Sequence, residues 1–317
     1  KSAANSISLE AIRKIIQEEL QEVSFVTVPF VFQPVKAELT KEEQTLLKDF
    51  FTSFDEHCLL NKKNKEKLRD DFEKAILYYH KKGTNLKKTL SYLDTKNLGG
   101  FYARPPVLWF PLDDAAKIYP LSMAHDRMAI FRLSVYLKEN IVPEILHMAL
   151  NFTIKRFPTF ATTLKKGFFW HYLDTTKRRF KVEEECDIPS QPIKVSVSGS
   201  QSFRVKYYQN RISIEFFHVL TDGTGGIAFL TSLTAEYLKL LGASIPKSNL
   251  ILNINDEPSK EEYENAFKNV EITYNINNSY GWHNNIFHAA PRGQEFIFDY
   301  DASDEKMRKW LAGVLGV

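Results

Sequence analysis

A histidine, an aspartate and several glycines lie close together in one segment whose spacing could support chemistry. They are His218, Asp222 and Gly223, followed by Gly225 and Gly226. Because a neutral imidazole takes up a proton close to neutral pH, His218 is a candidate general base. Asp222 could orient that imidazole, as the aspartate of a catalytic triad does. The competing interpretation is a structural histidine at the end of a buried strand.

The surrounding sequence predicts the elements that would position the histidine. Residues 211–217 are rich in β-branched and aromatic side chains and predict a strand that ends at His218. A glycine-rich turn follows, and apolar residues at helical spacing from residue 227 onward predict an amphipathic helix. A side chain between a strand and a loop is aimed by a rigid scaffold and remains accessible. The glycines are expected to allow positive φ and close approach of a substrate, and they also suit a tight turn.

The chain on either side of this segment predicts a layered α/β or α+β architecture. Strands are predicted over residues 129–137, 162–165, 168–173 and 202–208, and a helix over residues 142–156 that Pro158 ends. Gln209 and Asn210 predict a hairpin turn between the last two strands of this part. Strands mixed with long helices in this order are typical of a sheet covered by helices.

Residues 1–104 predict a mainly helical unit of unknown role. Helices are predicted over residues 8–20, 66–79 and 85–93, and a β-rich run over residues 23–32. A further helix begins at Thr40, which forms a capping box with Glu43. Turn residues at 97–100 and the pair Pro105–Pro106 predict a boundary. A second domain is expected over residues 105–268, and a short α/β tail over residues 269–317.

Composition excludes several classes of protein. The chain has 317 residues, 44% of them hydrophobic, which argues against long disorder. Its net charge of +3, from 42 basic and 39 acidic residues, is too small to indicate nucleic-acid binding. Cys58 and Cys186 lie far apart, so we expect no disulfide framework, no metal site and a reducing cytoplasm. No segment approaches the roughly 18 apolar residues of a membrane span.

Other candidate sites are weaker. The run over residues 222–226 lacks the ending of a P-loop, which excludes nucleotide binding there. His283 and His288 have no obvious third metal ligand. Asp113, Asp114 and Lys117 are expected to cap a helix first and to contact a substrate second.

The spacing His-x-x-x-Asp-Gly over residues 218–223 resembles the active-site signature of the chloramphenicol acetyltransferase and condensation-domain superfamily. Four other segments resemble, in the same order, parts of the bacterial alcohol acetyltransferase-like proteins in that superfamily: residues 112–120, 154–158, 168–172 and 261–263. The resemblance covers about residues 107–268, roughly half of the chain.

This resemblance implies a two-layer chloramphenicol acetyltransferase-like lobe preceded by the helical unit. It also implies a CoA-dependent acyltransferase that moves an acyl group, acetyl being expected, from a thioester to an alcohol or amine, with His218 as general base. In the resembled family the residue at Asp222 is structural, pairs with an arginine and holds the loop. An oxyanion would need hydrogen-bond donors, for which Thr221, Thr224 and Gly225 are the candidates.

The resemblance is incomplete, because condensation-type acyltransferases have two similar lobes and only one is evident here. Ser279 to His283 is a poor substitute for the Asp-Phe-Gly-Trp-Gly motif of the second lobe. Three explanations stay open: a fragment, a lobe supplied by another protomer, or lost catalysis. The expected partners are a small acceptor, an acyl-CoA or acyl-carrier donor, and a homo-oligomer that completes the site, with no bound cofactor. The alternative function is a catalytically inactive binding or interaction protein built on half of the fold.

Overall fold

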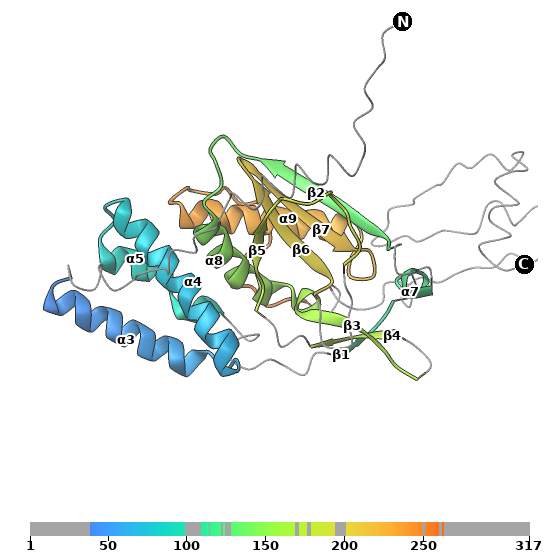
Figure 1. The fold of residues 1–317 in the computed structure, drawn as a ribbon, viewed down its shortest axis with the longest axis horizontal. Helices are drawn as coiled ribbons and strands as arrows, with labels where there is room; N and C mark the ends of the chain where they lie inside the picture. Colours follow the sequence, from blue (N-terminus) through green and yellow to red (C-terminus); the bar gives the residue numbers. More distant parts are fainter. Residues whose placement is uncertain are drawn as a thin grey trace, which may run out of the picture. The chain divides into compact units, whose positions relative to one another are not determined.

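The computed structural model describes residues 39–98, 109–113, 115–121, 123, 128–168, 171–175, 179–193, 201–248, 251–259 and 262 (Figure 1). The chain divides into two compact units, Lys1–Thr45 and Leu46–Val317. The described residues from Leu46 onward belong to the second unit, which holds both sheets and the histidine. The predictions outside the described residues are the helix over 8–20, the β-rich run over 23–32, the domain boundary near 104, Asp114, the histidines His283 and His288, and the tail over 269–317.

The sheet that carries the histidine has four strands in the order β2-β7-β6-β5. They are β2 (Ile130–Tyr136), β7 (Arg211–Phe217), β6 (Phe203–Tyr208) and β5 (Val182–Glu184). Strand β7 is antiparallel to its neighbours β2 and β6, and β5 runs parallel to β6. The predictions for β2, β6 and β7 are confirmed, and Gln209, with φ of 49°, occupies the predicted turn. Strand β5 was not predicted, because its three residues, two of them charged, show no apolar alternation.

A second sheet has three antiparallel strands in the order β1-β4-β3. They are β1 (Trp109–Pro111), β4 (His171–Thr175) and β3 (Thr162–Lys166). The prediction for β3 is confirmed, whereas the strand predicted over residues 168–173 begins at His171 instead. In the register of β3 and β4, Lys166 pairs with His171, the first residue of β4.

The helices follow the predicted pattern closely. They are α3 (Lys41–His57), α4 (Lys62–Lys81), α5 (Leu86–Tyr92), α7 (Ile118–Leu121), α8 (Pro143–Thr153) and α9 (Gly223–Leu240). Short 3-10 segments cover Thr95–Leu98, Ile154–Arg156 and Pro158–Ala161. The predicted capping box is confirmed, since the Glu43 amide donates to Thr40 Oγ1 at 3.3 Å and the Thr40 amide donates to the Glu43 carboxylate at 3.0 Å.

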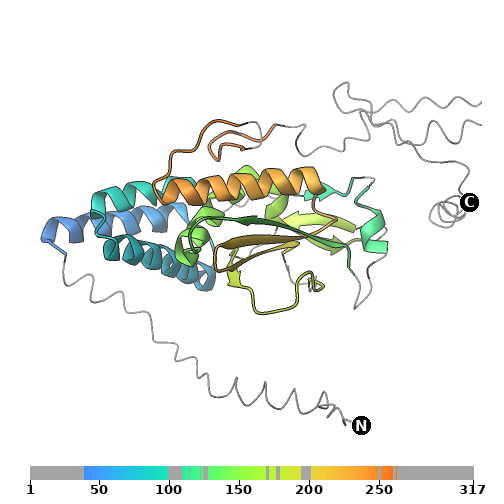
Figure 2. The ribbon, with the colours of Figure 1, turned by 90° about the horizontal axis from the view of Figure 1, so that it is seen from above.

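Helices α8 and α9 cover one face of the four-stranded sheet (Figure 2). Phe229 of α9 packs edge-on against Phe216 of β7 and Phe203 of β6, and all three side chains are fully buried. Burial of such aromatic side chains is the main stabilising contribution of this layer. The described residues therefore form the mixed α/β fold that the sequence predicts.

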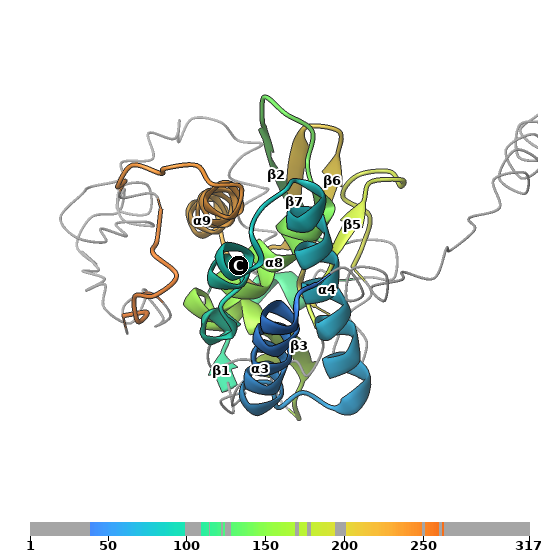
Figure 3. The ribbon, with the colours of Figure 1, turned by 90° about the vertical axis from the view of Figure 1, so that its left-hand side faces the viewer.

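Helix α4 lies beside α8 in the second unit (Figure 3). Phe72 of α4 meets Phe152 of α8 with ring centroids 6.3 Å apart, and the Tyr79 hydroxyl donates to the Leu240 carbonyl at 2.5 Å. Asp71 forms a buried ion pair with Arg179. The helices predicted to form the first domain thus pack directly on elements of the second, while the boundary between them remains a prediction.

Candidate active site

His218 lies directly after the last residue of β7 and is half-buried. Its amide donates to the Ala129 carbonyl at 2.9 Å, which extends the β2–β7 ladder by one step beyond the strand. A turn over residues 218–220 follows, and α9 begins at Gly223. The sheet therefore fixes the backbone of the histidine, and the residue as a whole remains partly accessible to solvent.

Two aromatic rings contact the imidazole of His218. The ring of Tyr119 is stacked on it, with centroids 4.5 Å apart and planes inclined by 17°. The ring of Phe131 lies 4.9 Å away at 55°, and it also stacks on Phe216 in the core. Phe131 was part of a predicted strand, but nothing in the sequence marked Tyr119 except its place in the segment 112–120.

Tyr119 is held by the turn that leads into α7. The Asp113 carboxylate accepts a hydrogen bond from the Ala116 amide at 2.6 Å, so it stabilises the turn before α7, whereas the sequence predicted that it caps the helix itself. The Tyr119 amide donates to the Ala116 carbonyl at 3.3 Å. Burial raises the pKa of the Tyr119 phenol, and the charges of Asp113 and Asp222 raise it further. The phenol is therefore neutral at physiological pH.

Asp222 is the N-cap of α9. Its carboxylate accepts the Gly225 amide at 2.9 Å, and its carbonyl accepts the Gly226 amide at 3.0 Å. Within the described part of the chain, no hydrogen bond joins this carboxylate to the His218 ring and no arginine pairs with it. The carboxylate thus stabilises the start of the helix that follows the histidine.

The glycines after Asp222 serve close packing. A Cβ on Gly225 would lie 2.1 Å from Thr221 Oγ1, and one on Gly226 would lie 3.0 Å from Leu133 Cδ1. Gly223 has open space around it. The expectation of positive φ is wrong for all three, because they belong to the first turn of α9. Helical dihedrals replace the left-handed ones that a loop would have required.

The candidate oxyanion donors differ in what they already bind. The Gly225 amide is taken by Asp222, and the Thr221 hydroxyl donates to the Asp222 carbonyl at 3.4 Å. Thr224 is exposed in the first turn of α9. Among the hydrogen bonds of the described residues, none uses the amides of Gly223 or Thr224. These first-turn amides carry the partial positive charge of the helix N-terminus.

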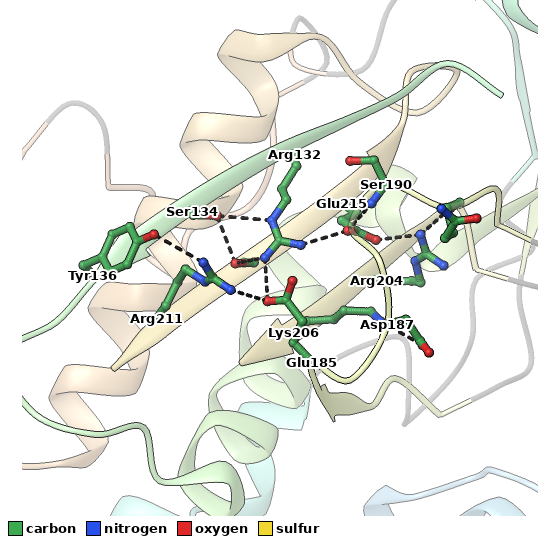
Figure 4. A network of polar contacts seen from close by, with 12 residues as sticks. Arg132, Ser134, Tyr136, Glu185, Asp187, Ser190, Arg204, Lys206, Arg211 and Glu215 are labelled. Carbon is green, nitrogen blue, oxygen red and sulfur yellow. Dashed lines mark hydrogen bonds and ion pairs between the residues drawn. The ribbon is translucent and has the colours of Figure 1, made fainter. Parts of the chain in front are cut away.

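The opposite face of the same sheet is charged (Figure 4). Glu215 of β7, 1% exposed, lies between Arg132 of β2 and Arg204 of β6, at 3.0 and 2.6 Å. The segment around residues 185–191 covers this face: Glu185 accepts from Arg132 at 2.6 Å and from Arg211 at 2.7 Å. Hydrogen bonds from these arginines, Arg132 first, lower the pKa of Glu185.

No group of three histidine, cysteine, aspartate or glutamate side chains in the described part of the chain is arranged to hold a metal ion. Among the helices within the described residues, none is both long and apolar enough to span a membrane.

Comparisons with known proteins find similarity of structure but not of sequence. No protein-family model and no curated protein sequence matches the chain. The starter condensation domain of rhizomide synthetase RzmA is similar with a TM-score of 0.37 and 13% identity, over 44% of this chain and 40% of that chain. SgcC5 from Streptomyces globisporus gives 0.34 and 15% over 44% and 38% of the two chains.

Polyketide synthase associated protein 5 from Mycobacterium tuberculosis is similar with a TM-score of 0.32 and 12% identity, over 42% of this chain and 33% of that one. The chain therefore spans less than half the length of these structures. The similarity is a partial one to the condensation-domain fold.

Proposed function

We propose that this chain carries the histidine-bearing lobe of a CoA-dependent acyltransferase, with His218 as general base. The observation that carries the proposal is the display of His218 at the end of β7, half-buried, against the ring of Tyr119 and ahead of the N-terminus of α9. A purely structural histidine would be enclosed by apolar side chains, whereas this one remains partly accessible. The His-x-x-x-Asp-Gly resemblance of the sequence supports the same reaction.

The chemistry follows from the imidazole. The unprotonated ring takes the proton of the acceptor hydroxyl or amine while the acceptor oxygen or nitrogen attacks the thioester carbonyl. The carbonyl oxygen then carries the negative charge of a tetrahedral intermediate. When the carbon–sulfur bond breaks, the CoA thiolate leaves and receives the proton back from His218. The products are the ester or amide and free CoA, and no acyl-enzyme is required.

Backbone amides at the start of α9 would stabilise the oxyanion. The amides of Gly223 and Thr224 lie in the first turn of α9, five and six positions after His218. Amides at a helix N-terminus stabilise negative charge that develops in a transition state. The hydroxyl of Thr224 is a further donor in the same turn, whereas the Gly225 amide is committed to Asp222.

The acceptor is a small alcohol or amine, the expected acyl group is acetyl, and the donor is an acyl-CoA or an acyl carrier. The other walls of the acceptor site would come from a second lobe. A further copy of the chain or another polypeptide would supply that lobe.

Thiol release tests the proposal. Purified protein is incubated with acetyl-CoA and a panel of small alcohols and amines, and free CoA is measured above the background of the two free cysteines, Cys58 and Cys186. We expect acceptor-dependent release that falls by roughly 100-fold or more in His218→Ala. The matched control is His171→Ala, because His171 lies on β4 of the other sheet.

The control variant should keep full activity, and circular dichroism should show that both variants are folded. Absence of acceptor-dependent thiol release from the wild-type protein, or equal release from His218→Ala, would contradict the acyltransferase function and leave the binding protein as the better account.

A further inference from the structure

Among the described residues, no hydrogen-bonding partner sets the orientation of the His218 ring. In the described part of the chain, the imidazole forms no hydrogen bond, and the aromatic rings of Tyr119 and Phe131 lie against it. The torsion that turns a histidine ring is broad and roughly two-fold, so a ring without such a partner can adopt several orientations. A general base must instead point one nitrogen at the proton that it removes.

We propose that Tyr119 is the positioning residue of His218 and that its stacked ring sets the plane of the imidazole. The near-parallel planes, 17° apart with centroids separated by 4.5 Å, allow the imidazole to slide but oppose its rotation out of the stack. Phe131 cannot fill this role alone, because its ring is tilted by 55° and packs on Phe216.

The backbone around Tyr119 is built to hold the ring in place. Leu112 and Ala116 are buried, the Asp113 carboxylate binds the Ala116 amide, and the Lys117 amide donates to the Asp113 carbonyl at 3.2 Å. The turn therefore fixes the backbone two residues before Tyr119. A tyrosine ring is also an electron-rich face, which stabilises the positive charge that the imidazole gains during proton transfer.

The stacking itself is tested by NMR, independently of any activity. Protein with isotope-labelled histidine should show the ring protons of His218 shifted upfield by the ring current of Tyr119. Tyr119→Phe keeps an aromatic ring and should keep this shift, whereas Tyr119→Leu should lose most of it. Tyr172→Leu is the matched control, because Tyr172 pairs with Trp109 on the other sheet, with centroids 6.0 Å apart.

The consequence for catalysis rests on the proposed function and is measured in the same variants. Tyr119→Leu should lower kcat by roughly 10- to 100-fold with little change in the KM for acetyl-CoA, because misplacing a catalytic group affects the reaction more than binding. Tyr119→Phe should keep kcat close to the wild-type value, and Tyr172→Leu should leave kcat unchanged.

The outcomes separate the two proposals. An unshifted His218 ring in the wild-type protein, or an equal shift in Tyr119→Leu, overturns the positioning role whatever the activity. A lost shift with unchanged kcat also overturns it. A wild-type protein that transfers no acyl group overturns the proposed function, and the positioning role is then decided by the NMR shifts alone.

Discussion

The two faces of the four-stranded sheet are built from the same strands but are covered by different kinds of contact. On β7, Ile212, Ile214 and Phe216 face the helices, while Ser213 and Glu215 face the segment around residues 185–191. All five side chains are buried. One face is closed by apolar and aromatic packing, and the other by hydrogen bonds and ion pairs.

The comparison explains how the histidine reaches its place. Because alternate residues of a strand point to the same face, His218 follows Phe216 on the apolar face and meets Phe131 there. The alternation that builds the core therefore also aims the imidazole. The charged face instead holds the covering segment: the Ser190 amide donates to Glu215 at 2.7 Å, and Arg132 bonds Glu185.

Truncation on the apolar face should have the largest effect. Phe216→Ala removes a fully buried ring that contacts four other phenylalanine rings, so we expect the free energy of unfolding to fall by about 4 kcal/mol. Urea unfolding followed by circular dichroism measures this loss. Phe168→Ala is the matched control, since Phe168 is 93% exposed and its loss should cost less than about 0.5 kcal/mol. Similar losses in the two variants would contradict this description of the core.

Breaking the charged face should cost slightly less. Glu215→Ala leaves Arg132 and Arg204 without their shared carboxylate, and we expect a loss of about 3 kcal/mol. The loss should change little with added salt, because Glu215 is only 1% exposed. Glu183→Ala on β5 removes a more exposed carboxylate and should cost less than about 1 kcal/mol. A loss for Glu215→Ala that disappears in high salt would mean that this face is open to solvent.

His147 links α8 on the apolar side to β5 and should make stability depend on pH. Its Nε2 accepts the Val182 amide at 2.7 Å, and burial, followed by the charges of Arg179 and Lys74, lowers its pKa to about 3. The unfolded chain binds a proton near pH 6.5 whereas the folded chain does not, so stability is lost as pH falls below that value. Between pH 6.5 and 5 we expect a loss of about 2 kcal/mol from this residue.

Urea midpoints measured across that range test the link. His147→Gln removes the titrating group, and its stability should vary less between pH 6.5 and 5 than that of the wild-type protein. The range between pH 6.5 and 5 lies above the pH at which Glu185 affects stability. Hydrogen bonds from Arg132 lower the pKa of Glu185, so its contribution to stability is lost only at more acidic pH. An unchanged pH dependence in His147→Gln would exclude His147 as its source.

Local patterns were sufficient to predict the strand and helix that flank the histidine. The strand over Arg211–Phe217 and the helix after Asp222 follow from β-branched alternation and from helical spacing. Contacts between distant residues were not predictable, because they depend on register. Arg132 and Glu215 are separated by 83 positions, and alternation indicates a shared face only after β2 and β7 are paired. Tyr119 escaped prediction because its contact with His218 depends on how the short helix α7 packs against the end of β7, which local sequence patterns do not indicate.

Variants of Asp222 should have the smallest effect on stability, and they distinguish a helix-capping role from an orienting role. As the N-cap of α9 it accepts the Gly225 amide, so Asp222→Ala should lower the free energy of unfolding by about 1 kcal/mol. Asp222→Asn keeps an equally good cap and should be within a few tenths of a kcal/mol of the wild-type protein. The same pair of variants separates a cap from an orienting carboxylate in the acyl-transfer assay. Asparagine should preserve most of kcat if the side chain only holds the helix start, whereas a triad role predicts a loss of roughly 1,000- to 10,000-fold. We expect the first result, because within the described residues the carboxylate bonds the helix amide and not the imidazole of His218.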